Sequence, residues 1–315
     1  MKTLFKKRHF LIFIIFISVL SCKKDQEPTP TPTPPPTSAN VPDAISSFFN
    51  QNVTDATQSF TIDASTWQSI NGTQGTSIWV APNSFNDANG NVVNGNITIE
   101  LIEVLTKADM IWLNKTTTSN DQLLISGGEI SVKAYQNGNQ LTLSSNGSLS
   151  VDIPSNNQGS MDLFSGTEDI NGNINWDTTN VPVLDSNGGY NFMLSTGITF
   201  GDSLGWFNCD IFTNFSNVTN LNVVLPTNHL GSNTACYIFF DNMYTVSKMY
   251  YASTTNQFYV PYIPVGEQVK IVAISELNGQ LYSSITPITI TANHTETITL
   301  TATTSSALQT DLNNL

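Results

Sequence analysis

The stretch GEISVKAYQNGNQLTL, residues 128–143, decides the fold class of this chain. Polar and apolar residues alternate strictly from Glu129 to Ala134, which is the period of a strand with one buried face. The dipeptide Asn137-Gly138 favours a tight turn, and the apolar positions Leu141 and Leu143 resume the alternation after it. The stretch therefore predicts a β-hairpin.

The same pattern recurs over most of the chain. Short apolar or alternating segments, bounded by Asn, Gly and Pro, occur at residues 76–82, 96–104, 149–153, 221–225, 235–240, 258–260, 269–274 and 297–302. Helical spacing stands out at residues 42–51, where Ile45, Phe48 and Phe49 share one face. We therefore predict an all-β protein with two β-sandwich modules, residues 41–215 and 216–303, followed by a frayed tail at 304–315. The second module is expected to be immunoglobulin-like, because about seven short strands follow one another there.

A leader precedes this body. Basic residues at the start are followed by an apolar stretch, residues 10–20, which is too short to span a bilayer as a helix. The sequence Val19-Leu20-Ser21-Cys22 then resembles the bacterial lipobox, where a signal peptide is removed just before a cysteine. The resemblance implies a signal peptide over residues 1–21 and diacylation of Cys22, which would anchor the protein to a membrane. An ordinary secretory signal with a chance cysteine is the alternative.

Residues 22–40 predict a tether. The charged tract Lys23-Lys24-Asp25-Gln26-Glu27 resembles the start of mature surface lipoproteins of the Bacteroidota type. The resemblance implies attachment to the outer membrane with display on the cell surface, and the periplasmic face is the alternative. Residues 28–37 contain Pro and Thr alone, which favours an extended polyproline II spacer of roughly 30 Å.

The folded part is acidic and contains few cations. Six of the 11 Lys and Arg residues precede residue 41, so residues 41–315 hold five lysines, no arginine and 22 acidic residues. Proteins that bind nucleic acid need basic contacts to displace counterions, so the composition argues against a nucleic-acid partner. The lack of arginine also argues against bidentate recognition of phosphate or carboxylate groups.

Several segments of the first module share an order of elements with a known family. A glycine-led strand at residues 75–80 is followed by Ala81-Pro82-Asn83-Ser84-Phe85 and a glutamate-bearing strand. The segments that carry the comparison further are GNITIEL (95–101), TKADM (106–110), LISGGE (124–129), MDLFSG (161–166) and LGWFNCD (204–210). This order resembles the ZU5 family in its bacterial surface-lipoprotein versions, and it implies a ZU5-like β-sandwich as the first module. Self-cleavage, which some relatives perform at a His-Phe-Ser step, is not implied, because Leu163 stands where the histidine would be.

Two cysteines remain if Cys22 is lipidated. Cys209 and Cys236 could form a disulfide in an oxidising compartment. Two separate buried thiols are an equally good interpretation, because free cysteine is among the most buried residue types.

One loop carries oxygen-bearing side chains at mostly alternate positions. Asp169, Asn171, Asn173 and Asp177 in the segment DINGNINWD are the ligand types that a hard cation such as Ca²⁺ prefers. The segment departs from an EF-hand loop, because glycine is fourth rather than sixth and no terminal glutamate follows. An Asn-Gly hairpin turn is the alternative.

Tryptophan side chains could stack against sugar rings. We expect Trp79 to lie in the core, because it is within a predicted strand. Trp112 and Trp176 are expected to be the exposed rings that a ligand could use.

Catalytic patterns are weak in this sequence. His229 and His294 have no partner nearby in the chain, and neither a nucleophile elbow nor a zinc-binding motif occurs. We therefore expect a non-catalytic outer-membrane lipoprotein, without a cofactor, that contacts surface proteins or polysaccharide. The alternatives are a glycan-binding lipoprotein of a polysaccharide-uptake system and a hydrolase that uses paired carboxylates as acid and base.

Overall fold

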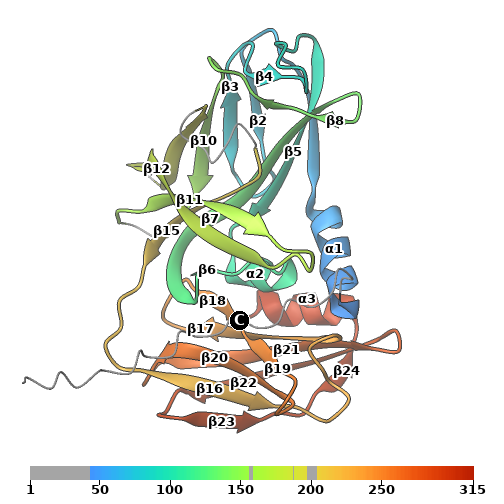
Figure 1. The fold of residues 1–315 in the computed structure, drawn as a ribbon, viewed down its shortest axis with the longest axis vertical. Helices are drawn as coiled ribbons and strands as arrows, with labels where there is room; N and C mark the ends of the chain where they lie inside the picture. The colour runs from blue at the N-terminus through green and yellow to red at the C-terminus, as the bar shows by residue number, and fades with distance from the viewer. Residues whose placement is uncertain (1–42, 156–158, 187, 197–203) are drawn as a thin grey trace, which may run out of the picture. The chain divides into compact units, whose positions relative to one another are not determined.

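The computed structural model describes residues 43–155, 159–186, 188–196 and 204–315. The predicted signal peptide, Cys22 and the Pro/Thr tether lie outside the described residues. Residues Asn40–Leu315 belong to one compact unit, in which strands far outnumber helices. The predicted all-β class is therefore confirmed (Figure 1).

Two sheets that share a core come from residues 58–212. The larger sheet has eight strands, with the order β1 (Gln58–Asp63), β5 (Asn96–Val104), β7 (Gln122–Gln136), β15 (Trp206–Phe212), β11 (Asp162–Glu168) and β12 (Ile174–Pro182), and with β6 (Thr118–Ser119) and β8 (Asn139–Gln140) paired to β7. The smaller sheet has five, in the order β13 (Leu184–Ser186), β14 (Gly189–Ser195), β10 (Ser148–Pro154), β3 (Ser77–Val80) and β2 (Gln68–Asn71). Buried aliphatic side chains from both sheets form one hydrophobic cluster, so the sheets pack face to face as in a β-sandwich.

The turn predicted at residues 137–138 is present. Asn137 and Gly138 have φ angles of 51° and 78°, and they connect β7 to β8. The second strand of the hairpin is shorter than predicted. After two residue pairs the chain leaves β7, and β9 (Thr142–Leu143) pairs instead with β4 (Phe85–Asn86).

The remaining strands form two further sheets. A four-stranded sheet has the order β19 (Tyr250–Ala252), β20 (Gln257–Pro264), β16 (Val218–Val224) and β23 (His294–Thr297). A five-stranded sheet has the order β18 (Val246–Lys248), β17 (Thr234–Phe240), β21 (Gln268–Leu277), β22 (Gln280–Thr289) and β24 (Thr301–Thr303). These sheets share a second core. The strand predicted at residues 297–302 is interrupted, because β23 and β24 belong to different sheets.

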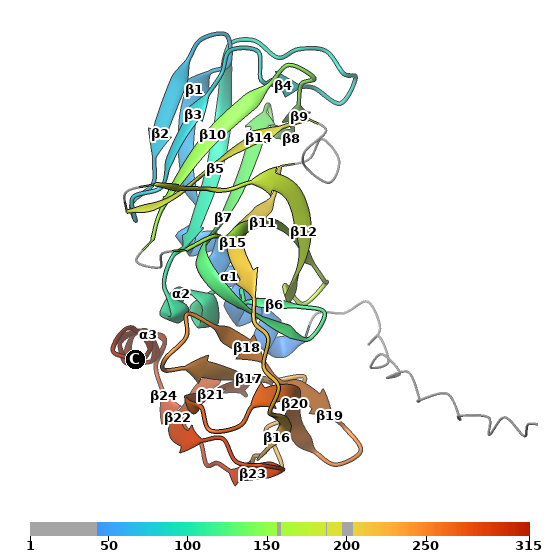
Figure 2. The ribbon, with the colours of Figure 1, turned by 90° about the vertical axis from the view of Figure 1, so that its left-hand side faces the viewer.

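The helices α1 (Ala44–Ala56), α2 (Lys107–Trp112) and α3 (Ser305–Asn313) pack in a third cluster, with side chains of β5, β17 and β21. In both views α2 and α3 lie between strands β1–β15 and strands β16–β24 (Figures 1 and 2). The predicted frayed tail is wrong. Leu308 and Leu312, one helical turn apart, are buried in this cluster, and the Thr304 side chain accepts a hydrogen bond from the Ala307 N–H at 3.2 Å. None of the described helices is long and apolar enough to cross a membrane.

Hydrogen bonds also join the two sets of sheets across this third cluster. The Tyr237 hydroxyl donates to Asn114 Oδ1 at 2.8 Å, and the Thr245 hydroxyl donates to the Leu124 carbonyl at 2.7 Å. The Lys107 ammonium group donates to the carbonyl oxygens of Phe240 and Met243. The junction is thus both apolar and specifically hydrogen-bonded.

Candidate functional site

The tryptophans predicted to be exposed are not the exposed ones. Trp176 is fully buried, and its Nε1 donates to the Thr116 carbonyl at 2.8 Å. Trp112 is half-buried. Its ring meets that of Phe48 edge to face, with 5.4 Å between the ring centroids. The prediction of an exposed stacking ring is therefore wrong for Trp176, and Trp112 is engaged in the third cluster.

Trp67 and Trp79 are exposed instead, at 70% and 42%. The prediction that Trp79 lies in the core is wrong. Its neighbours Ile78 and Val80 are both fully buried, so the alternation of the strand places Trp79 on the outer face. The run Ile-Trp-Val is apolar on both faces, and only the pairing of β3 with β10 decides which face is covered.

The two exposed indoles belong to one edge of the smaller sheet. Trp67 directly precedes β2 and lies two residues before Ser69, which is the register partner of Trp79. Ser150 of β10 pairs with Trp79 on its other side. We use the name tryptophan face for the outward residues of this sheet, which are Trp67, Ser69, Asn71, Ser77, Trp79, Ser150, Asp152, Leu184, Asn191 and Met193.

Amide and hydroxyl groups surround these rings. Asn191 Nδ2 donates to Asp152 Oδ1 at 2.7 Å, and Ser77 Oγ donates to Asn71 Oδ1 at 2.7 Å. Asp152 is the one ionisable residue of the tryptophan face as defined. Flat indole rings can cover the apolar C–H face of a sugar, while amides and hydroxyls exchange hydrogen bonds with its hydroxyl groups. The face therefore has the chemistry to bind an uncharged, polyhydroxylated ligand.

A pocket of about 500 Å³ begins just beyond the end of β3. We use the name asparagine pocket for it, and its lining residues are Pro82, Asn83, Asn86, Gly90, Val92, Ser144, Ser145 and Asn146. None of these lining residues is ionisable. The Oδ1 atom of Asn86 is buried and has no hydrogen-bond partner among the described residues. The pocket thus adds neutral hydrogen-bonding groups near the tryptophan face.

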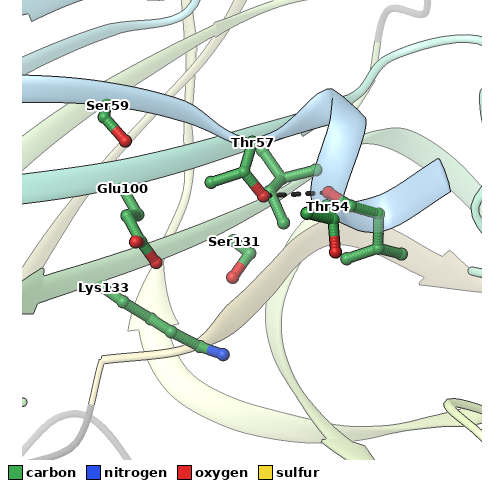
Figure 3. Close-up of a pocket in the computed structure, with 8 residues that line it drawn as sticks. Thr54, Thr57, Ser59, Glu100, Ser131 and Lys133 are labelled. Carbon is green, nitrogen blue, oxygen red and sulfur yellow. Dashed lines mark hydrogen bonds between the residues drawn. The ribbon is translucent and has the colours of Figure 1, made fainter. Parts of the chain in front are cut away.

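A second pocket, of about 390 Å³, lies where α1 ends against the outer face of the larger sheet (Figure 3). Glu100 of β5 and Lys133 of β7 are register partners on its floor. The remaining polar lining consists of the hydroxyl groups of Thr54, Thr57, Ser59 and Ser131. The lining has a single carboxylate and no histidine, so it does not provide the two carboxyl groups that a glycosidase needs.

Two carboxyl groups do converge elsewhere, on the neighbouring strands β7 and β15. Glu129 and Asp210 are both 0% exposed. Burial raises the pKa of Glu129 to about 8, and burial together with the nearby Glu129 raises the pKa of Asp210 well above its usual range. A glycosidase needs its carboxyl groups to face a substrate. This buried pair therefore gives the hydrolase alternative no support.

A serine and a histidine also meet. His229 Nδ1 lies 2.8 Å from Ser275 Oγ, which is the distance expected between a nucleophile and its base. Ser275 is 0% exposed, and its hydroxyl also contacts the Asn233 carbonyl oxygen at 3.1 Å. Burial lowers the pKa of His229. This pair connects the end of β21 to the loop between β16 and β17, and a substrate could not reach the buried serine oxygen.

The loop predicted to bind calcium forms a hydrogen-bonded turn. Asp169 Oδ1 accepts from the backbone N–H groups of Asn171 and Asn173 at 2.8 and 2.9 Å. Asp169 Oδ2 accepts from the side-chain amide of Asn173 at 2.8 Å. These are the contacts of an Asx turn, so the Asn-Gly turn is the interpretation that the structure favours.

The other oxygens of this loop also accept hydrogen bonds. Asn171 Oδ1 accepts from the Asp43 N–H at 2.9 Å, and Asn173 Oδ1 accepts from Lys248 Nζ at 2.5 Å. Asp177 lies on β12, outside the turn. An ammonium group thus contacts the loop where a calcium ion would have to bind, which argues against the predicted calcium site.

The two cysteines do not pair. Cys209 and Cys236 are both free and buried. Cys209 belongs to the core of the first two sheets, and Cys236 belongs to the core of the last two. The structure therefore favours two separate thiols over the disulfide.

The candidate site is the tryptophan face with the adjoining asparagine pocket. Sequence reasoning missed Trp67 and the pocket, since their Asn- and Ser-rich loops carry the same signal as ordinary turns. The predicted lipidation site, Cys22, lies outside the described residues. The chain matches none of the protein-family models, and no curated protein matches it either.

Proposed function

We propose that this protein is an outer-membrane lipoprotein, anchored through Cys22 and displayed on the cell surface, whose β body binds a partner without catalysis. The leader, the lipobox-like residues and the Pro/Thr tether support the anchoring. The observation that carries the binding role is the exposure of Trp67 and Trp79, at 70% and 42%, on a sheet whose other face is packed. Exposed large aromatic side chains of this kind mark interaction surfaces.

We also propose that the body consists of a ZU5-like module at residues 41–215 and an immunoglobulin-like module at residues 216–303. The change of sheets supports this division, because β15 ends at Phe212 in the eight-stranded sheet and β16 begins a different sheet at Val218. The two hydrophobic cores support it as well, since each is enclosed by its own pair of sheets.

A glycan is the ligand class that the candidate site favours. The rings of the tryptophan face and the neutral amides of the asparagine pocket suit an uncharged polysaccharide. The excess of acidic residues in the body also disfavours an acidic polymer. We therefore infer that the protein captures neutral polysaccharide at the cell surface, and a surface protein that uses the same rings is the second candidate.

Glycan-array binding followed by calorimetry tests this inference. We expect each of Trp67→Ala and Trp79→Ala to weaken binding about fivefold, since one stacked ring contributes about 1 kcal/mol. Tyr262→Ala is the matched control, because Tyr262 is 57% exposed but belongs to β20. Unchanged affinity in the double tryptophan variant would show that the face is not the site. Binding of a surface protein but no glycan, lost in the same variants, would favour the second candidate.

Mass spectrometry of the mature protein tests the anchor. We expect the chain to begin at Cys22 and to carry acyl chains on it. Digestion of intact cells with a broad-specificity protease should then remove the body. An unmodified Cys22, or a leader still attached, would contradict the anchoring. A body that survives digestion would place the protein on the periplasmic face.

A further inference from the structure

Unpartnered buried polar atoms are concentrated at one place in this fold. Seven buried side-chain nitrogen and oxygen atoms of the described residues have no hydrogen-bond partner. Five of the seven belong to Glu129, Asn208 and Asp210, which are all 0% exposed. Buried polar groups in proteins are nearly always satisfied, so a cluster of five demands an explanation.

A β-bulge brings these side chains together. Asn208 is the register partner of Glu129, whereas Asp210 pairs with Ser126, and the register shifts between Cys209 and Asp210. The shift leaves Gly127 as the extra residue on β7, so side chains three positions apart on that strand can share a face. Ser126 Oγ accordingly donates to Asn208 Oδ1 at 2.8 Å.

The bulge depends on two glycines. A Cβ atom at Gly127 would overlap the ring of Tyr190, and one at Gly128, where φ is +134°, would overlap Ile153. The two glycines therefore permit the bulge that places Glu129 and Ser126 opposite Asn208 and Asp210. Bulges often occur where a fold directs side chains toward a ligand.

Ionising both acids of this cluster is costly without a counter-ion. Two neighbouring carboxylates in a buried site repel each other. For Asp210 the loss of water outweighs the side-chain hydrogen bond with Ser126, and the carboxylate oxygens of Glu129 have no hydrogen-bond partner among the described residues. Lys115 is a cation whose charge acts to lower the pKa of Glu129 against the effect of burial. Its ammonium group is bonded elsewhere, to Glu168 Oε1 at 2.7 Å and to the Gly172 carbonyl at 2.9 Å.

We propose that Glu129, Asp210 and Asn208 form an internal site for a hard divalent cation of the calcium type. Two carboxylates supply up to four oxygens. If the side-chain amide of Asn208 is rotated by half a turn, its nitrogen faces Ser126 and its oxygen supplies a fifth ligand. Calcium takes six to eight oxygen ligands and accepts water among them. The described residues contain no group of three or more His, Cys, Asp or Glu side chains suited to a metal, so the amide is an essential part of this site.

Thermal unfolding and metal analysis of the full chain test the proposal. We expect chelation to lower Tm and added CaCl₂ to raise it again, by about 5 °C or more at calcium concentrations about a hundredfold above Kd. Glu129→Gln with Asp210→Asn should abolish this response. Asp169→Asn is the matched control, because it alters the other calcium-like loop, and it should keep the wild-type response.

Terbium provides a readout that does not depend on stability. Trp206 lies on the same strand as Asn208, two residues away, so it faces the same side of the sheet. We expect Tb³⁺ bound to the wild-type chain to luminesce when tryptophan is excited, and Ca²⁺ to displace it. A wild-type chain that neither responds to calcium nor sensitises terbium would overturn the proposal. So would a double variant that keeps both properties.

Discussion

The Nζ atom of Lys115 lies 2.7 Å from Oε1 of Glu168, although the two side chains differ sharply in exposure, at 2% and 33%. Lys115 also packs over the ring of Trp206 and donates to the Gly172 carbonyl. Its charge is thus held inside the protein by a carboxylate that remains partly in water. The two partners should therefore differ in how much their removal costs.

Glu168→Ala should destabilise the protein more than Lys115→Met. The alanine variant leaves an ammonium group buried without its counter-charge, which we expect to cost about 1–3 kcal/mol after allowing for the exposure of Glu168. The methionine variant keeps an apolar chain in place and leaves Glu168 free to be hydrated, so it should cost less than about 1 kcal/mol. Urea unfolding of both variants measures the difference, and equal losses would contradict it.

Loss of the proton from Lys248 should make the protein more stable as the pH rises above neutrality. Burial lowers the pKa of Lys248 to about 8, from 10.5 in the unfolded chain, and although part of the residue is exposed its ammonium group is enclosed. Below pH 8 both states hold the proton. Between about pH 8 and 10.5 the unfolded state binds more protons, so stability increases with pH.

Lys248→Met isolates this effect from the other titrating groups. Relative to this variant, the wild-type free energy of unfolding should rise on the order of 1–2 kcal/mol between about pH 7.5 and 9.5. Chemical denaturation at the two pH values gives the comparison. Parallel pH profiles for the two proteins would exclude Lys248 as the cause.

The C-terminal helix α3 should contribute to the stability of the whole body. Leu308 is 0% exposed, so Leu308→Ala should cost about 2–5 kcal/mol through lost burial and a new cavity. Gln309→Ala is the control, because the neighbouring Gln309 is exposed and should change stability by less than about 0.5 kcal/mol. Similar Tm values for the two variants would show that α3 is dispensable.

Trp176 and Trp79 should behave oppositely when they are replaced by alanine. Trp176 is fully buried, and its loss should cost about 3–5 kcal/mol. Trp79 is 42% exposed on the outer face, so its loss should cost much less while weakening ligand binding. Unfolding curves and binding isotherms of the same two variants separate the roles. A stable Trp176→Ala protein that has lost binding would reverse the assignment.

The reactivity of the cysteine thiols should report both the burial of Cys209 and Cys236 and the acylation of Cys22. Burial raises the pKa of both Cys209 and Cys236, so neither should react with a maleimide in the native protein. After unfolding without a reductant, two thiols should react if Cys22 is acylated and three if it is not. An absence of reactive thiols after unfolding would instead indicate the disulfide.

Strands could be predicted from the sequence where one face of the strand is polar. Residues 96–104 are predicted as a strand and form β5 with the same bounds. Prediction failed where an apolar run left both faces alike, as around Trp79, since a partner strand decides burial there. It also failed at α3, where two leucines mark the buried face and the rest of the helix is polar, so the tail resembled a frayed end.

The candidate site was harder to predict than the fold. The exposed rings are predicted at Trp112 and Trp176, although only Trp176 has polar neighbours in sequence. Both rings instead pack where distant segments meet. The acid pair was hidden for a similar reason, since Glu129 and Asp210 are 81 positions apart and meet through a sheet pairing.

The way this fold uses its lysines should affect its resistance to proteases. Enzymes of the trypsin type cut after lysine or arginine, and residues 41–315 contain five lysines and no arginine. The ammonium groups of Lys107 and Lys248 bond across the junction between the sheets, that of Lys115 bonds to the Gly172 carbonyl, and Lys270 is paired with Asp241. A secreted tryptic protease therefore meets few cleavable bonds, and these lie in or beside ordered helix and strand, so the folded body should persist where such enzymes are abundant.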